Sequence, residues 1–299
     1  MSMRGGWVLK IDIQKFFDTL DHAHLRSILG RRVGDGVILR LIGKWLNAGV
    51  LESGCVTHPE AGSPQGGVIS PLLANVYLHE VLDTWFEGTV KPRLTGRAFL
   101  IRYADDAVMV FEKKGDADRV LEVLPKRFGK YGLALHSEKT RLVAFHPPRR
   151  GVDPDDGDGS GPDSFDLLGF THYWGLSRKG NWVVKRKTAK GRLSRALQRI
   201  SEWCRLHRHR PVIEQWKMLS SKLRGHYGYY GIMGNVRSVG LFRHTTERIW
   251  RKWLDRRSNK ARMIWERFAA LLARYPLPPA RLPRSAYTQR IHRMTSRMR

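Results

Sequence analysis

Two neighbouring carboxylates between two apolar runs are the feature that most restricts how this chain can fold. Residues 99–103 and 108–111 are apolar and rich in strand-forming side chains, and Ala-Asp-Asp-Ala at 104–107 separates them. Two such runs joined by a few turn residues predict a β-hairpin. Asp105 and Asp106 would then lie at the turn of that hairpin.

A third carboxylate follows an earlier segment with strand periodicity. Apolar Trp7, Leu9 and Ile11 alternate with other residues, which predicts a strand that ends near Asp12. Like charges at close range need a cation, and two Mg²⁺ ions about 3.5–4 Å apart could activate a 3′-hydroxyl and stabilise a pyrophosphate leaving group. The three acids therefore point to phosphoryl transfer. The alternative for an Asp-Asp pair is ordinary turn chemistry.

The order of the remaining segments predicts an α+β fold for the first part of the chain. Helical periodicity falls at about residues 24–45, 71–86 and 117–131, and a strand is expected at 141–145. Strands and helices in this order favour an α+β layer over a doubly wound nucleotide-binding sheet. Beyond about residue 188 the pattern becomes helical with basic residues between the apolar ones, which predicts an all-α basic bundle.

Charge divides the chain in the same way. The sequence has 54 Lys and Arg against 27 Asp and Glu, a net charge of +27. Residues 1–150 carry 22 basic and 16 acidic side chains (+6), 151–166 carry none and 6 (−6), and 167–299 carry 32 and 5 (+27). This excess favours a polyanionic partner. We expect domains at 1–175 and 176–299, with an acidic Gly/Pro loop at about 147–166.

Cysteine and apolar content limit the class of protein further. With only Cys55 and Cys204, a disulfide framework and a four-cysteine zinc site are excluded, and a reducing cytosol fits. No apolar run approaches the roughly 18 residues of a membrane span. We therefore expect a bacterial-type cytosolic protein with no membrane partner.

Three spaced motifs resemble successive palm motifs of reverse transcriptases. They are KIDIQKFFD at 10–18, GSPQGGVISPLLAN at 62–75 and YADD at 103–106. In their details they are similar to group II intron-encoded reverse transcriptases, also called maturases. The resemblance implies an α+β palm, an antiparallel sheet with packed helices, followed by an all-α basic thumb and maturase domain. It also implies an RNA-directed DNA polymerase, a nucleotidyltransferase of mobile elements with a role in RNA splicing.

The resemblance assigns the catalytic centre residue by residue. It implies that Asp12, Asp105 and Asp106 bind two Mg²⁺ ions, with the backbone carbonyl of Ile13 as a further ligand. Lys139 matches a basic residue near the departing pyrophosphate, where a cation offsets developing charge or supplies a proton. The alternative for Lys139 is a solvated surface lysine.

Further motifs imply contacts with nucleotide and primer. Phe17 matches the bulky side chain that excludes the 2′-hydroxyl of an incoming ribonucleotide. The other interpretation of Phe17 is an ordinary aromatic residue of the core. Gln65 and Gly66 match the loop that touches nucleotide and template, with a flexible turn as the alternative. Leu168, Gly169 and Phe170 resemble a primer-grip hairpin. The other interpretation of these three residues is a hydrophobic strand with a bulge glycine.

The basic half resembles the region of these proteins that binds intron RNA. LRGHYGYYG at 223–231 and WRKWLDRRS at 250–258 carry the resemblance. Cations neutralise phosphates, and we expect most of the tryptophans to pack the bundle rather than bind RNA. The expected RNA-binding residues are Lys185, Arg186, Lys187, Arg192, Arg195, Arg224, Arg251, Lys252, Arg256 and Arg257.

The chain departs from the family pattern at both ends. Asp12 lies eleven residues from Met1, whereas these polymerases carry a fingers region upstream, and no counterpart of their optional HNH endonuclease follows. We therefore expect a truncated, weakly active polymerase that acts with intron RNA, a DNA primer and deoxynucleoside triphosphates. Two protein partners fit this expectation, a second copy of the chain, in a homodimer, and a polypeptide that supplies the fingers region. The alternative function is a non-enzymatic RNA-binding splicing cofactor whose palm is only a scaffold.

Overall fold

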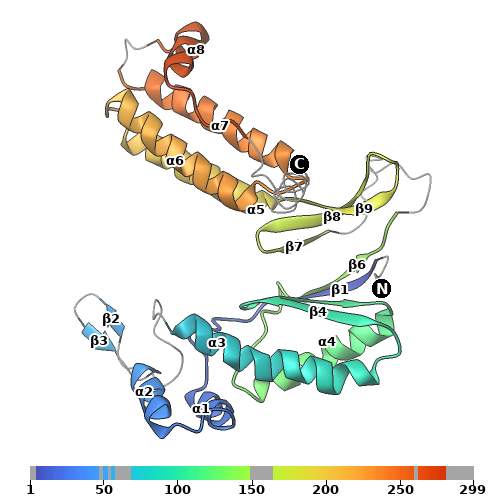
Figure 1. The fold of residues 1–299 in the computed structure, drawn as a ribbon. Helices are drawn as coiled ribbons and strands as arrows, with labels where there is room; N and C mark the ends of the chain where they lie inside the picture. Colours follow the sequence, from blue (N-terminus) through green and yellow to red (C-terminus); the bar gives the residue numbers. More distant parts are fainter. Residues whose placement is uncertain are drawn as a thin grey trace, which may run out of the picture. The chain divides into compact units, whose positions relative to one another are not determined.

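The computed structural model describes residues 5–46, 50–52, 55–57, 69–148, 164–258 and 262–280 of the 299 residues. The chain forms two compact units, whose elements are shown in Figure 1. The first comprises Met1–Leu168 with Tyr173–Val183, and the second comprises Gly169–His172 with Val184–Arg299. The boundary expected between residues 175 and 176 falls within a strand of a sheet that contributes to both units.

A four-stranded antiparallel sheet forms the centre of the first unit (Figure 1). Its strands, in spatial order, are β4(Ala98–Tyr103), β5(Asp106–Phe111), β1(Gly6–Ile11) and β6(Arg141–Phe145). The early strand, the hairpin and the strand at 141–145 are thus confirmed. Because β1 lies between β5 and β6, the end of the first strand comes next to the start of β5.

Four α-helices accompany this sheet. They are α1(His22–Gly30), α2(Gly36–Leu46), α3(Ser70–Leu78) and α4(Lys114–Gly129). The helical stretch expected at 24–45 is two helices, because the Asp35 carboxylate accepts the backbone N–H groups of Val37 and Ile38 at 2.7 and 3.3 Å and starts a new helix there. Asp21 caps α1 in the same way through the N–H of His24.

The helix that begins at Ser70 changes its winding after Leu78. The segments η1(His79–Thr84) and η2(Phe86–Val90) are π-helical, and η3(Lys91–Arg93) is a short 3₁₀ turn. The sequence pattern predicted a helix here but not this winding. π-Helical turns are rare and are found frequently at functional sites.

The two faces of the central sheet have different cores. Leu9, Ile11 and Met109 are buried among the helices, on what we call the helix side. Val8 and Val108 are buried with aromatic residues of the following strands, on what we call the strand side. Side chains alternate along a strand, so a slip of one residue would exchange the two cores, and the register is strongly fixed.

Strand periodicity did not predict two further sheets, although the family resemblance implied a hairpin at residues 168–170, where one of them has its first turn. A hairpin is formed by β2(Val50–Glu52) and β3(Cys55–Thr57), and a three-stranded sheet by β7(Phe165–Leu167), β8(Phe170–Leu176) and β9(Trp182–Thr188). Short strands near glycine-rich or charged segments give weak periodicity, which explains why sequence reasoning passed over them.

The second unit is helical, as expected. Its helices are α5(Lys190–Leu206), α6(Val212–Tyr230), α7(Val236–Asp255) and α8(Trp265–Arg274). Trp250 is fully buried in the helical core and donates its indole N–H to the buried amide oxygen of Gln215 at 2.9 Å. Trp203 and Trp253 pack partly buried against the same core. Among the described residues, no helix is both long and apolar enough to cross a membrane.

Candidate active site

The acidic turn closes the hairpin of β4 and β5. Tyr103 pairs with Asp106, so Ala104 and Asp105 are the two central residues of the turn. Ala104 has a φ of 54°, a left-handed conformation that a residue with a Cβ adopts at a cost of about 1–2 kcal/mol. Strained backbone of this kind is concentrated at functional sites.

Strand register brings Asp12 next to Asp106. Ile11 pairs with Ala107, and one further step along both antiparallel strands sets Asp12 opposite Asp106. Asp12 is four residues from Val8 and Asp106 is two residues from Val108. Because side chains alternate along a strand, both acids lie on the same side as these valines, the strand side of the sheet. Opposed residues of an antiparallel pair have Cβ atoms about 4.5–5.5 Å apart, and like charges placed so are destabilising without a cation. Two of the three predicted acids therefore come together at one end of the sheet.

The third acid occupies the turn itself. Asp105 is exposed, whereas Asp12 and Asp106 are half-buried. Within the part of the chain that the structure describes, no three His, Cys, Asp or Glu side chains form a ready-made metal cluster. The site thus consists of two opposed carboxylates with a third on the adjoining turn.

Lys139 lies beside the first of these acids. Its ammonium is 3.5 Å from Asp12 Oδ1, and the side chains are 56% and 26% exposed, respectively. The main chain around Lys139 is bound to the same residue, because the N–H of His136 donates to the Asp12 carbonyl at 2.8 Å and the Asp12 N–H donates to Thr140 Oγ1 at 3.3 Å. Backbone pairing therefore fixes the approach of Lys139 to Asp12.

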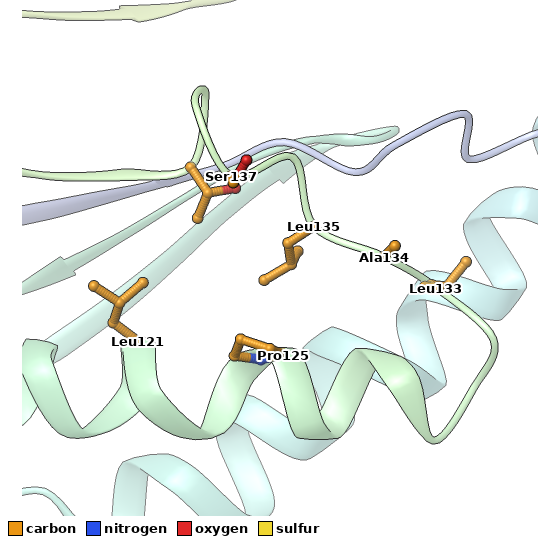
Figure 2. A pocket seen from close by; sticks show the side chains of 7 residues that line it. Leu121, Pro125, Leu133, Ala134, Leu135 and Ser137 are labelled. Atoms are coloured by element: carbon orange, nitrogen blue, oxygen red, sulfur yellow. The ribbon is translucent and has the colours of Figure 1, made fainter.

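The loop that carries Lys139 faces α4 across a pocket. Figure 2 shows Leu121 and Pro125 of α4 facing Leu135 and Ser137 across a pocket. Leu135 also forms an antiparallel bridge with Ile13. The loop is thus joined to the end of β1 by this bridge, and Leu135 packs against the main core.

Ile13 is buried at this bridge. The bridge bonds are made by its neighbours, since Gln14 N–H donates to the Ala134 carbonyl and the Asp12 carbonyl accepts from His136. Backbone groups alternate in direction along a strand, so the Ile13 carbonyl points to the β5 side, away from the loop. That direction suits its predicted role as a ligand.

The predicted nucleotide contacts are only partly within the described chain. Phe17 is half-buried against the main core, with its ring centroid 5.4 Å from that of Phe16. The packing of Phe17 against the core is therefore observed, and its steric role at the nucleotide stays a prediction. Gln65 and Gly66 lie outside the described residues.

The predicted primer grip is a tight hairpin turn between β7 and β8. Leu168 and Gly169 have φ values of 51° and 76°, as a two-residue turn between twisted strands requires. Gly169 therefore serves a turn and not a strand bulge. Phe170 follows, with its ring stacked at 5.8 Å on Tyr229 and tilted at 5.3 Å to Tyr230 of α6.

The predicted RNA-binding cations fall into two groups. Arg251 donates to the Met263 carbonyl at 2.9 Å, and its guanidinium lies 4.2 Å from the Trp265 ring centroid. Arg257 donates to the carbonyls of Arg208 and Arg210, and burial lowers its pKa. Arg251 and Arg257 thus bind the protein itself, and Lys185 is half-buried. The exposed members are Arg186, Lys187, Arg192, Arg195, Arg224, Lys252 and Arg256.

Sequence reasoning missed one group of residues at the acidic turn. Arg102, two residues before Ala104, contacts Asp83 and Asn75 on the helix side. An arginine at an inward position of an apolar strand was the signal that could have identified it.

A helix-backed antiparallel sheet with acids at a hairpin turn and at a neighbouring strand end is the palm architecture of nucleic-acid polymerases. Residues 3–172 match the family described as "Reverse transcriptase (RNA-dependent DNA polymerase)". The chain belongs to this family, which confirms the resemblance found in its motifs. Reverse transcriptases generally use divalent metal ions.

Similar proteins include group II intron-encoded proteins. The chain is 32% identical to protein YkfC of Escherichia coli K12 over 171 residues, 46% of this chain and 44% of YkfC. It is 43% identical to the group II intron-encoded protein LtrA of Lactococcus lactis over 75 residues, 25% of this chain and 12% of LtrA. The chain therefore spans less than half the length of these curated relatives.

Among the solved structures that the chain matches is apo telomerase from Candida tropicalis, truncated from its C-terminal domain. It has a TM-score of 0.46 and 16% identity, and the match covers 62% of this chain and 36% of the telomerase chain.

Proposed function

We propose that this chain is an RNA-directed DNA polymerase of the group II intron type. It extends a DNA primer on intron RNA with deoxynucleoside triphosphates, and it binds the intron RNA to assist splicing. The observation that carries the proposal is the register that sets Asp12 opposite Asp106, beside the Asp105 turn, in a member of the reverse transcriptase family.

The acids present fit Mg²⁺. Magnesium keeps several waters and is usually held by one or two carboxylates plus substrate phosphates, so a closed cage of three protein ligands is not required. Asp12 and Asp106 supply two carboxylates on one side of the sheet, and Asp105 and the Ile13 carbonyl are the further oxygen donors. When bound, Mg²⁺ would lower the pKa of the primer 3′-hydroxyl and offset charge on the leaving pyrophosphate.

Side chains of this chain supply the remaining parts of the reaction. The Lys139 ammonium, more than half exposed and next to Asp12, is within reach of a departing pyrophosphate and can donate it a proton. Phe17 limits the space at the sugar of the incoming nucleotide. Leu168, Gly169 and Phe170 hold the primer through their tight turn.

The exposed cations of the second unit hold the RNA. Arg192 and Arg195 are one helical turn apart on α5 and extend from the same exposed face. Contacts from such residues to phosphates are independent of sequence and together give most of the affinity. The proposal also includes a cytosolic location for the protein. It further includes a protein partner, which is either a second copy of this chain or a polypeptide that supplies the fingers region.

A second function is favoured by the Lys139–Asp12 ion pair. An ammonium at 3.5 Å already balances the carboxylate that a metal ion would use. In that case the palm is a scaffold, and the protein is an RNA-binding splicing cofactor.

One experiment separates the two functions. Primer extension on an RNA template with Mg²⁺ is compared for the wild type and Asp105→Ala, alongside intron splicing by both proteins. The polymerase proposal expects extension by the wild type only, with splicing retained by Asp105→Ala. Asp118→Ala, which removes an exposed acid of α4, is the matched control. Extension that is absent from the wild type, with splicing intact, would favour the cofactor.

A further inference from the structure

Arg102 makes four hydrogen bonds behind the acidic turn. Its Nε and one terminal nitrogen donate to the two carboxylate oxygens of Asp83 at 2.7 and 2.6 Å. The other terminal nitrogen donates to Asn75 Oδ1 and to the Ala104 carbonyl, both at 2.9 Å. The side chain is only 13% exposed. A paired, two-point Arg–carboxylate contact of this kind fixes geometry as well as charge.

The partners of Arg102 are themselves held in place. Asn75 donates its amide nitrogen to the Pro71 carbonyl at 3.0 Å, which leaves its oxygen facing Arg102. Asp83 lies in the π-helical segment η1, where Arg127 donates to the Glu80 and Val81 carbonyls at 3.0 Å each. Arg102 is thus tied to side chains of the helix side that make further hydrogen bonds of their own.

The bond to Ala104 acts on the turn directly. Ala104 is the residue with φ 54°, and its carbonyl belongs to the rigid peptide plane that leads into Asp105. Arg102 and Ile11 both pair with Ala107, so their side chains lie on the helix side of the sheet, whereas those of Asp12 and Asp106 lie on the strand side. The guanidinium therefore acts on the acids by fixing backbone, not by pairing with them.

We propose that Arg102 is a positioning residue that clamps the Ala104 carbonyl so that Asp105 and Asp106 are held in place for divalent cations. The inference rests on the proposed function and extends it to a residue outside the site. Asp83 and Asn75 complete the clamp by fixing the guanidinium.

The same hairpin offers a matched control at its other end. Arg97 donates Nε and a terminal nitrogen to the two carboxylate oxygens of Glu112 at 3.1 and 3.2 Å. These side chains are 47% and 43% exposed, and the pair lies at the end of the hairpin opposite the turn. Arg97→Lys therefore removes the same two-point contact without touching the acidic turn.

The test measures metal affinity and turnover in Arg102→Lys, Asp83→Asn and Arg97→Lys of the full chain. Mn²⁺ binding is followed by electron paramagnetic resonance of the free ion, and primer extension gives kcat and the KM for nucleotide. Residues that orient metal ligands typically change metal affinity or activity about 10- to 100-fold when replaced. We expect such a loss in Mn²⁺ affinity and kcat for Arg102→Lys, a smaller one for Asp83→Asn, and little change in nucleotide KM.

Three outcomes overturn the clamp. One is full rescue by lysine, since a single ammonium cannot hold Asp83 and the Ala104 carbonyl in the same geometry. Another is an equal loss in Arg97→Lys. The third is a lower Tm in both Arg102→Lys and Asp83→Asn with unchanged Mn²⁺ affinity, which is a structural role only. Asp83→Asn keeps the shape of the side chain. If Arg102→Lys does not fold, the Mn²⁺ affinity and kcat of Asp83→Asn test the clamp instead.

Failure of the proposed function gives a different result. A wild type that neither binds Mn²⁺ nor extends a primer overturns both proposals. A wild type that binds Mn²⁺ and extends a primer, with Arg102→Lys and Asp83→Asn equal to it in both measurements, overturns only the clamp. If the wild type binds Mn²⁺ without extension, the affinity comparison alone decides the role of Arg102.

Discussion

The two units of this protein fix their charged side chains in opposite ways. In the first, Asp12 and Asp106 are set opposite each other by strand register, and Lys139 is bound near them through its loop backbone. In the second, cations such as Arg192 and Arg195 extend from an exposed helix face above a core of buried aromatics. A site built by register should depend strongly on single residues. A surface of exposed cations should instead contribute to RNA binding as a sum of many small terms.

The largest expected effect tests the collective behaviour of the second unit. If the protein engages about six to ten phosphates, a rise from 50 to 200 mM salt weakens RNA binding by about three to five decades, because released counterions dominate the affinity. Equilibrium binding to intron RNA at several salt concentrations measures this slope. A nearly flat response would contradict RNA binding by the exposed cations.

The next effect tests the single-residue dependence of the first unit. Asp12→Asn keeps the size of the side chain but removes one negative charge from the opposed pair, so we expect primer extension to fall about 10³-fold, since a bound metal ion supplies several kcal/mol of transition-state stabilisation. RNA affinity should stay within about twofold, and Tm should change little, because relief of the repulsion with Asp106 offsets loss of the half-exposed ion pair with Lys139. Asp118→Asn on α4 is the control. An equal loss of RNA affinity and extension would break the contrast between the units.

We expect the half-buried His226 to make the helical unit sensitive to acid. Burial lowers the pKa of His226 to about 4, and its ring stacks at 3.7 Å on Phe242. Between pH 6.5 and 4 the unfolded chain therefore binds a proton that the folded chain excludes, so stability rises with pH through this range and is lost as pH falls. The full shift corresponds to a few kcal/mol at most, at about 1.4 kcal/mol for each pKa unit.

Urea unfolding at pH 7 and pH 4.5 measures this dependence. In His226→Phe the loss of stability on acidification should be smaller than in the wild type, whereas exposed His209→Gln should behave like the wild type. An unchanged pH dependence in His226→Phe would show that other groups cause the acid sensitivity.

Within the second unit, structural and binding cations can be distinguished. Arg257→Ala removes the guanidinium donor of the Arg208 and Arg210 carbonyls, which still accept from the Gln215 amide, so we expect a loss of about 0.5–1.5 kcal/mol in the free energy of unfolding. Arg192→Ala should change the free energy of unfolding by less than about 0.5 kcal/mol. It should reduce the slope of the logarithm of the RNA-binding constant against the logarithm of salt concentration by about 1. Urea unfolding and salt titrations of both variants test the assignment, which is wrong if their effects are exchanged.

Sequence reasoning identified the elements that depend on local pattern. The alternation at residues 7–11, the hairpin around Asp105 and Asp106, and the helical periodicity beyond residue 188 all correspond to observed elements. The approach of Asp12 to Asp106 was inferred from family motifs. The pattern alone did not contain the insertion of β1 between β5 and β6 that produces it.

What could not be predicted depends on contacts distant in sequence. Arg257 and Arg251 look like RNA ligands in a basic run, but their carbonyl partners lie in other segments. The π-helical segment η1 has tertiary contacts of this kind, since Arg127 donates to the Glu80 and Val81 carbonyls. Periodicity reports which side of an element is buried, and it does not report which partner a polar group finds there.

The smallest expected effect concerns the strained turn that carries the acids. Glycine adopts positive φ without the penalty of about 1–2 kcal/mol, but it loses about 0.5–1 kcal/mol more through its freedom in the unfolded chain. Ala104→Gly should therefore raise the free energy of unfolding by about 0.5–1 kcal/mol. Ala98→Gly, at the buried first residue of β4 where φ is not positive, should lower it by a similar amount.

The same substitution also bears on the contrast between the two units. If backbone geometry positions the acids, a turn that glycine makes more stable but less restricted should extend a primer more slowly, with RNA affinity unchanged. Urea unfolding, primer extension and RNA binding of Ala104→Gly measure the three quantities. A lower stability than the wild type would show that the turn stores no strain, and a parallel change in RNA affinity would show that the two units do not act independently.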